Sequence, residues 1–223
     1  MKLIFILLAT ILIAGCKVDN YPGPSLTFAG KIVDNETGEA VQSGGINAGT
    51  VVKLYEGSST QPLLLATRPD GTFTNAAMFP GTYTYTAEGP FTPVSSTPET
   101  LTMNNNSEIE IKVVPNVRMK MSLVSSAGNS AVVKIDYEKV NTAQDLTTVG
   151  VVWSKYPNPN SLTFSGGDLL LTDVAPTDPS TGTMNLDLNS LTSHSTYYIR
   201  AIGRTNNPGG YFNYSEQYQL DIP

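Results

Sequence analysis

The sequence predicts an all-β protein built from two tandem β-sandwiches. From Leu26 onward, apolar and polar residues alternate, and turn residues recur at intervals of about eight to twelve positions, as in sandwiches and barrels. No stretch has a helical period of useful length. The chain has 223 residues, which exceeds one small β domain and fits two domains of about 100 residues each.

Composition excludes several classes of protein. Hydrophobic residues make up 40% of the chain, which is enough to bury a core, so wholesale disorder is excluded. The 13 Lys and Arg residues against 19 Asp and Glu leave a net charge of −6, which argues against nucleic acid as a partner. The single cysteine excludes an intramolecular disulfide or a thiolate zinc cluster, and we expect no cofactor.

The first residues have the pattern of a secretory signal peptide over residues 1–15. Lys2 supplies the positive charge, and the apolar run of residues 3–14 is too short to span a bilayer. The run ends in Leu-Ile-Ala-Gly-Cys at positions 12–16, which resembles a bacterial lipobox. That resemblance implies cleavage before Cys16 and acylation of its thiol, whereas the alternative is an ordinary signal peptide followed by an incidental cysteine.

Residues 16–25 are expected to form a short tether to the membrane. Residues 17–20 (KVDN) partly resemble the signal that sends lipoproteins to the outer face of the outer membrane, and residues 21–24 (YPGP) predict a stiff, extended segment. We therefore expect a protein anchored in outer-membrane lipid through acylated Cys16 and facing the cell exterior.

The first sandwich is predicted over residues 26–114. Expected strands lie at residues 25–32, 50–55, 63–67, around 73, 81–87 and 108–113. In the last of these, Ile109, Ile111 and Val113 point inward while the charged residues between them face water. The segments GKIVD (30–34), TGEAV (37–41), PDGTF (69–73) and PGTY (80–83) resemble a carboxypeptidase regulatory-like domain. This resemblance implies a transthyretin-like sandwich that is itself non-catalytic.

The second sandwich is predicted over residues 117–223, after a boundary at Pro115, which cannot continue a central strand. Alternating apolar residues predict strands around residues 117–123, 133–137, 149–153, 184–188, 197–201 and 214–216. Leu191 precedes Tyr197 by six positions, a spacing that resembles the tyrosine corner of a fibronectin type III-like domain. In such a corner the tyrosine hydroxyl bonds back to the chain upstream.

The order of lipobox, regulatory-like domain and fibronectin-like domain resembles a family of two-domain bacterial surface lipoproteins of undetermined function. Relatives in that family accompany starch-utilisation-type glycan uptake systems. The resemblance implies polysaccharide or oligosaccharide, and the components of a glycan importer, as partners.

The sequence offers little for catalysis or metal binding. His194 is the only histidine, and it lies in an expected turn without a nucleophile elbow, so a solvated role is favoured. Asp168, Asp173 and Asp178 lack the spacing of a calcium loop, although an ion at a sandwich edge is an alternative. A covalent bond from Lys31 to an asparagine is a further alternative, but the strand at 108–113 has no asparagine. We predict neither an enzyme nor a metal site.

Two aromatic clusters are candidate ligand sites, because sugars bind to aromatic faces flanked by amides and carboxylates. The first comprises Tyr156, Phe164, Asn158, Asn160 and Trp153, in a loop expected at the end of the second sandwich away from the first. Within this cluster, Trp153 is in phase with Val149 and Val151, so a core position is favoured for it. The second comprises Tyr211, Phe212 and Tyr214, for which packing between the domains is favoured over ligand binding.

The sequence thus predicts a non-enzymatic outer-membrane surface lipoprotein that binds glycan or assists a glycan-uptake complex. The alternative is a structural or protein-interaction module with no affinity for sugar. Exposed aromatic and asparagine side chains favour the first interpretation.

Overall fold

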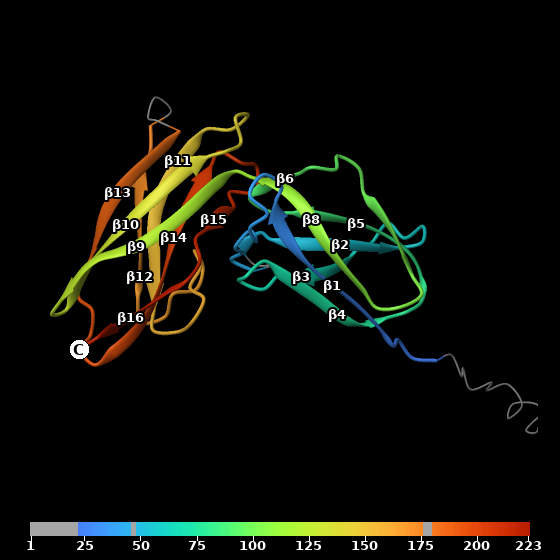
Figure 1. The fold of residues 1–223 in the computed structure, drawn as a ribbon, viewed down its shortest axis with the longest axis horizontal. Coiled ribbons are helices and arrows are strands. Elements are labelled where there is room, and N and C mark those ends of the chain that lie inside the picture. Colours follow the sequence, from blue (N-terminus) through green and yellow to red (C-terminus); the bar gives the residue numbers. More distant parts are fainter. Residues whose placement is uncertain (1–21, 46–47, 176–179) are drawn as a thin grey trace, which may run out of the picture.

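The computed structural model describes residues 22–45, 48–175 and 180–223. Within these ranges the chain forms sixteen β-strands and no α-helix, and the strands build two β-sandwiches that lie side by side (Figure 1). No helix of these residues has the length and apolar character to cross a membrane. The expected signal peptide, Cys16 and most of the expected tether lie outside the described residues. The all-β prediction is confirmed.

The first sandwich consists of strands β1 to β8. Their bounds are β1 Leu26–Asp34, β2 Val51–Glu56, β3 Leu63–Ala66, β4 Thr72–Met78, β5 Gly81–Glu88, β6 Phe91–Pro93, β7 Glu99–Met103 and β8 Ser107–Pro115. One sheet has the order β4-β1-β8-β6 and the other has the order β3-β2-β5-β7. The alternation in the sequence explains the core between them, since Tyr83, Tyr85 and Ala87 of β5 are buried and the threonines between them are more exposed.

Strand β1 is central to its sheet. It pairs with β4 antiparallel and with β8 parallel, and the parallel ladder runs from Phe28 opposite Ser107 to Asp34 opposite Val113. Gly30 lies where the strands approach most closely, because a Cβ there would stand 2.3 Å from the Ile109 carbonyl oxygen. The N-terminal strand is therefore held on both sides along its length.

The second sandwich consists of strands β9 to β16. Their bounds are β9 Val117–Ala127, β10 Ser130–Lys139, β11 Leu146–Ser154, β12 Asp168–Asp173, β13 Thr181–Leu188, β14 Ser195–Thr205, β15 Phe212–Tyr214 and β16 Tyr218–Ile222. One sheet has the order β13-β10-β9, and the other has β12-β11-β14-β15 with β16 also on β14. Residues 214–216 are not the last strand as expected, because the chain continues into β16, which pairs with the start of β14.

The predicted tyrosine corner is present in the second sandwich. The buried Tyr197 hydroxyl accepts a hydrogen bond of 2.9 Å from the backbone N–H of Thr192, five residues upstream. Leu191 beside it is buried in the same core. This contact fixes the turn that contains His194, which is exposed and has a φ of 56°.

The outer face of the five-stranded sheet is also buried, which alternation alone does not predict. Strand β11 is buried at nearly every position, on both faces. A separate apolar cluster covers its outer face; it consists of Val152, Ile202, Phe212 and Tyr214, with Phe164 and Leu169 packed against it. This covered face meets the first sandwich.

Polar groups join the two sandwiches. Arg200 is among the most buried residues described, with 1% exposure. Its Nη1 donates a hydrogen bond of 2.9 Å to the Ser43 carbonyl across the junction. The hydroxyl of Tyr211 donates to Glu88 Oε1 over 3.0 Å. Such directional bonds fix the angle between the sandwiches more tightly than apolar contact would.

Candidate functional site

The first predicted cluster is dispersed in the structure. Tyr156 is 67% exposed, whereas Trp153 is buried in the core of the second sandwich, as favoured from its phase in β11. Phe164 is half-buried against the outer apolar cluster. Asn158 has a φ of 61° and donates its backbone N–H to the side chain of Gln217. Of the aromatic side chains in the cluster, only Tyr156 is well exposed.

The loop that carries this cluster does not lie away from the first sandwich, so that expectation is wrong. The Asn160 amide donates to the Gly44 carbonyl of the first sandwich over 3.2 Å. Its side-chain oxygen accepts the backbone N–H groups of Leu162 and Thr163, so the amide is occupied in shaping the loop. The loop folds back because the outer face of β11 and β14 is apolar and Phe164 covers it.

The second predicted cluster lies at the domain junction, as the sequence favours. Tyr211 reaches Glu88, and the Tyr214 hydroxyl bonds to Ser161 while the Tyr214 ring lies 4.5 Å from the Arg200 guanidinium. Phe212 packs in the outer cluster beneath Arg204. Gly49 has a φ of 100°, and a Cβ there would overlap the Tyr211 ring at 1.9 Å. Tyr211 and Tyr214 therefore help to build the junction.

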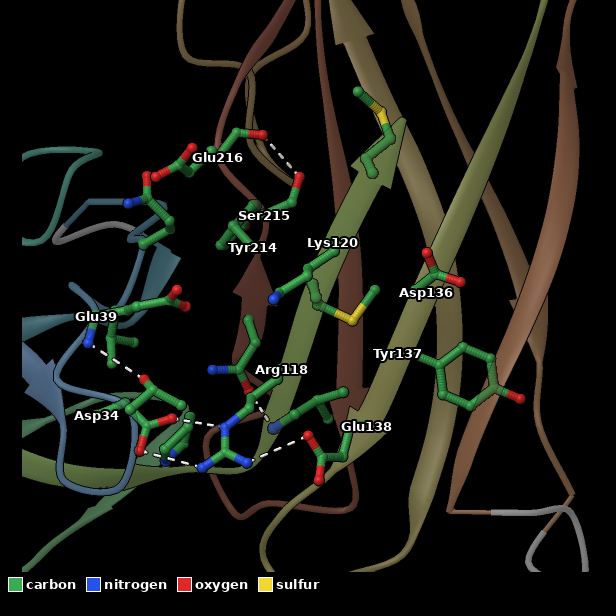
Figure 2. A pocket seen from close by; sticks show the side chains of 18 of the residues that line it. Asp34, Glu39, Arg118, Lys120, Asp136, Tyr137, Glu138, Tyr214, Ser215 and Glu216 are labelled. Carbon is green, nitrogen blue, oxygen red and sulfur yellow. Dashed lines mark hydrogen bonds and ion pairs between the residues drawn. The ribbon is translucent and has the colours of Figure 1, made fainter. Parts of the chain in front are cut away.

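A cleft with a volume of about 770 Å³ lies between the two sandwiches. We call it the junction cleft (Figure 2). The first sandwich contributes the end of β1 and the segment that follows it, from Asp34 to Gln42. The second contributes parts of β9, β10 and β13, together with Asn213 to Glu216. Tyr214, from the second predicted cluster, is one of its lining residues.

One wall of the junction cleft is the outer face of the sheet β13-β10-β9. Two rows of side chains cross this face, Arg118–Glu138–Thr181 and Lys120–Asp136–Thr183. They face outward because Met119 and Tyr137, which alternate with them, are buried in the core. The same alternation that builds the core therefore gives the cleft a continuous polar wall.

Arg118 organises the lower part of the junction cleft. Its Nε donates to Asp34 Oδ2 over 2.6 Å, and its other nitrogens reach Glu36 and Glu138. Burial alone would raise the pKa of Asp34, but the hydrogen bonds from Arg118 and from backbone N–H groups lower it overall. The hydrogen bonds to Asp34, Glu36 and Glu138 in turn raise the pKa of Arg118. This group is a fixed ionic link between β1 and β9 (Figure 2).

Four charged or amide side chains of the junction cleft are not occupied in this way: Glu39, Gln42, Lys120 and Glu216. Among the described residues, their side chains make no hydrogen bond or ion pair. Figure 2 shows Glu39 and Glu216 on one side of the cleft and Lys120 on the other. They supply acceptors and donors to whatever enters the cleft.

No local pattern in the sequence marks these four residues as a site. Each lies in a segment that looks like an ordinary solvent face or turn, and Lys120 alternates with core methionines. Their convergence depends on the angle between the two sandwiches, which has no local signal in the sequence. The outward position of Lys120 was the only part that alternation indicated.

A smaller pocket of about 410 Å³ lies at the edge of the second sandwich, between β12 and β13. Its lining comprises Trp153, Gly166, Gly167, Asp168, Leu170, Asp187, Asn189, Ser190 and Tyr197. Of the first predicted cluster, Trp153 alone lines either of these two cavities. Because the Trp153 and Tyr197 side chains are almost wholly buried, they offer little ring surface for stacking.

The residues described contain no group of three or more His, Cys, Asp or Glu side chains placed to hold a metal ion. Lys31 pairs with Glu110 of β8 over 3.0 Å rather than with an asparagine. The carboxylates Asp34 and Glu138, which face each other across the lower cleft, are both tied to Arg118. The arrangement can bind through hydrogen bonds and charge.

Comparison with known proteins rests on solved structures. No family model and no curated protein matches the chain. The chain shares its fold with DUF3823 family proteins. One from Bacteroides uniformis aligns with a TM-score of 0.73 at 18% identity, over 90% of this chain and 100% of the other. One from Parabacteroides merdae aligns with a TM-score of 0.71 at 20% identity and the same coverage.

A further similar structure, also from Bacteroides uniformis, is that of a protein proposed to bind carbohydrate. It aligns with a TM-score of 0.72 at 19% identity, again over 90% of this chain and all of the other. At these identities the likeness establishes a common two-sandwich fold. It carries no residue of a binding site from one protein to the other.

Proposed function

We propose that this protein is a non-enzymatic, lipid-anchored carbohydrate-binding protein of the outer membrane, which holds a glycan in the junction cleft. The observation that carries the proposal is the set of unoccupied polar side chains, Glu39, Gln42, Lys120 and Glu216, that converge on a preformed cleft of about 770 Å³ between two domains. Clefts of this size at domain interfaces are common ligand sites.

The chemistry of the junction cleft suits hydroxyl groups. Carboxylates accept hydrogen bonds from sugar hydroxyls, an ammonium donates to them, and an amide does both. Carboxylates outnumber cations along the cleft, five against two, so a neutral glycan is favoured over a sulfated or uronic acid chain. The carboxylates beside Arg118 are held as ion pairs, so they are poorly suited to act as general acids.

Two further observations support this proposal. The lipobox-like sequence ending at Cys16 suits a protein held at a membrane surface, where glycans are captured. A protein with the same two-sandwich fold has itself been proposed to bind carbohydrate. Association with a glycan importer belongs to the same proposal and rests on the family resemblance of the sequence.

The test is titration calorimetry and affinity electrophoresis against a panel of neutral and acidic polysaccharides. We expect binding to a neutral glycan, weakened about tenfold or more by Lys120→Ala or Glu216→Gln, since each removes a hydrogen bond to a charged group. Lys112→Ala and Glu108→Gln, on exposed positions of β8 outside the cleft, are matched controls and should bind normally.

Two outcomes would contradict the proposed site. If Tyr156→Ala and Phe164→Ala abolish binding while the cleft variants do not, the ligand lies on the loop predicted from the sequence. If no glycan binds, and importer components are instead recovered with the protein in pull-down experiments, the protein-interaction module is the better description.

A further inference from the structure

Two edge strands of the first sandwich lie next to each other with little of the usual protection, apart from a register shift of β4 against β1 between Leu26 and Phe28. Strand β3 ends one sheet and β4 ends the other, and the two strands are in contact. Exposed edges normally carry charged residues, proline or a bulge that blocks pairing with other chains. The sequences of β3 (LLLA) and β4 (TFTNAAM) contain no charged residue and no proline.

Several apolar side chains are exposed along this double edge, together with Thr74 of β4. Leu63 and Leu64 of β3 are each 50% exposed, and Phe79, directly after β4, is 45% exposed. Ala66, Ala76 and Ala77 lie exposed between them. We call this surface the β3–β4 edge. Of the large hydrophobic side chains exposed on the described part of the first sandwich, only Val94 lies elsewhere.

The chain enters the first sandwich beside the β3–β4 edge. Leu26, the first residue of β1, pairs with Met78, and Ser25 donates its N–H to the Met78 carbonyl, so Phe79 is next to the point of entry. In Figure 1, β3 and β4 form the lower border of the first sandwich, and the N-terminal chain departs from the end of that border. Cys16 precedes Leu26 by ten residues, which reach at most about 35 Å.

We infer that the β3–β4 edge rests on the lipid surface to which Cys16 is anchored. This inference depends on the proposed acylation of Cys16 and adds the face of the molecule that meets the membrane. A short tether keeps the edge close to the bilayer, so even a small apolar area favours contact. Burial of the exposed parts of two leucines and one phenylalanine supplies the attraction.

The contact is shallow. The outer backbone groups of edge strands need hydrogen-bond partners, which the hydrocarbon core of a bilayer does not offer. At the level of the headgroups, water and lipid oxygens can supply them while the leucine and phenylalanine side chains reach the acyl boundary. Strands β3 and β4 themselves carry no lysine or arginine, so the proposed contact relies on their apolar side chains.

The experiment places a tryptophan in the β3–β4 edge of the full-length, acylated protein in phosphatidylethanolamine–phosphatidylglycerol vesicles that contain brominated lipid. Phe79→Trp tests the edge, and Val124→Trp, at an exposed position on β9 of the second sandwich, is the matched control. The native Trp153 is buried in the second sandwich and gives both proteins the same background. Intact mass measured beforehand reports the acyl chains on Cys16.

We expect brominated lipid to quench Phe79→Trp at least twofold more than Val124→Trp, with a shift of its emission to shorter wavelength. Leu63→Ser with Leu64→Ser in the Phe79→Trp protein should abolish that quenching.

Equal quenching in acylated Phe79→Trp and Val124→Trp overturns the inference and leaves the anchor intact. The inference is also overturned if brominated lipid does not quench the introduced tryptophan of Phe79→Trp but its protection from water increases with protein concentration. The edge is then assigned to contact with a second copy of the chain. Absence of acyl mass refutes the anchor itself.

Discussion

Replacement of Arg118 by methionine tests the ionic link between the two sandwiches. The side chains of Asp34 and Arg118 are only 7% and 18% exposed, and Arg118 makes bonds of 2.6 and 3.3 Å to the two carboxylate oxygens. Hydrogen bonds between charged partners contribute about 1.5–3 kcal/mol each, and the longer one here is weak, so we expect a loss of about 3 kcal/mol in unfolding free energy. The exposed partners Glu36 and Glu138 add about 0–1 kcal/mol.

The pH dependence of this loss has a definite sign. In the wild type the pKa of Asp34 is below its ordinary value of 3.8, so its contribution is present above that pH and disappears as pH falls through the lowered pKa. In Arg118→Met the burial of the carboxylate is no longer opposed by a cation, so the pKa of Asp34 rises. The difference in stability between the two proteins is therefore largest near neutral pH. It shrinks as the pH falls through the raised pKa of the variant, and shrinks further below pH 3.8 as the wild type loses its ion pair.

Urea unfolding followed by the fluorescence of Trp153 and by circular dichroism measures this difference. Lys112→Met, a comparable loss of cationic charge on an exposed position of β8, is the control and should change stability little. A loss of less than about 1 kcal/mol in Arg118→Met, in the range of a surface pair, would refute the reasoning. So would a loss that stays constant as the pH falls.

Three other substitutions give clear expectations. Tyr197→Phe removes the hydroxyl that accepts the Thr192 N–H, and should lower the unfolding free energy by about 1 kcal/mol in the same assay. Gly49→Ala should cost more than Gly57→Ala in thermal unfolding: both residues have positive φ, but only at Gly49 would the new Cβ strike a ring, that of Tyr211. An equal cost would show that Tyr211 can move aside. Cys16→Ser should leave the protein without acyl mass and move it from the detergent phase to the aqueous phase on phase separation; unchanged partitioning would contradict the proposed anchor.

The fold was predictable because it depends on local alternation. In β5 and β10 every second residue is apolar and buried, so the inward face follows from the sequence alone. The spacing from Leu191 to Tyr197 likewise indicated a corner whose hydroxyl bond is now seen. These features involve residues a few positions apart, where backbone geometry leaves few choices.

The junction was harder to predict because it joins residues that are far apart in the sequence. Arg200 lies in a strand whose alternation suggests a solvent face, yet the first sandwich covers it and its Nη1 reaches Ser43. Its pKa falls to about 10 because burial removes the guanidinium from water. The same covering accounts for the positions of Asn160, which bonds to Gly44, and of Phe164, which packs on the outer apolar cluster.

The parallel ladder between β1 and β8 has a mechanical consequence. The N-terminal end of β1 and the C-terminal end of β8, where the second sandwich begins, lie at opposite ends of that ladder. A force between the N-terminus and the second sandwich therefore acts in shear along the two strands. It loads all the residue pairs from Phe28–Ser107 to Asp34–Val113 together instead of separating them one at a time. The first sandwich is built to resist stretching forces along the direction in which its two ends are drawn apart.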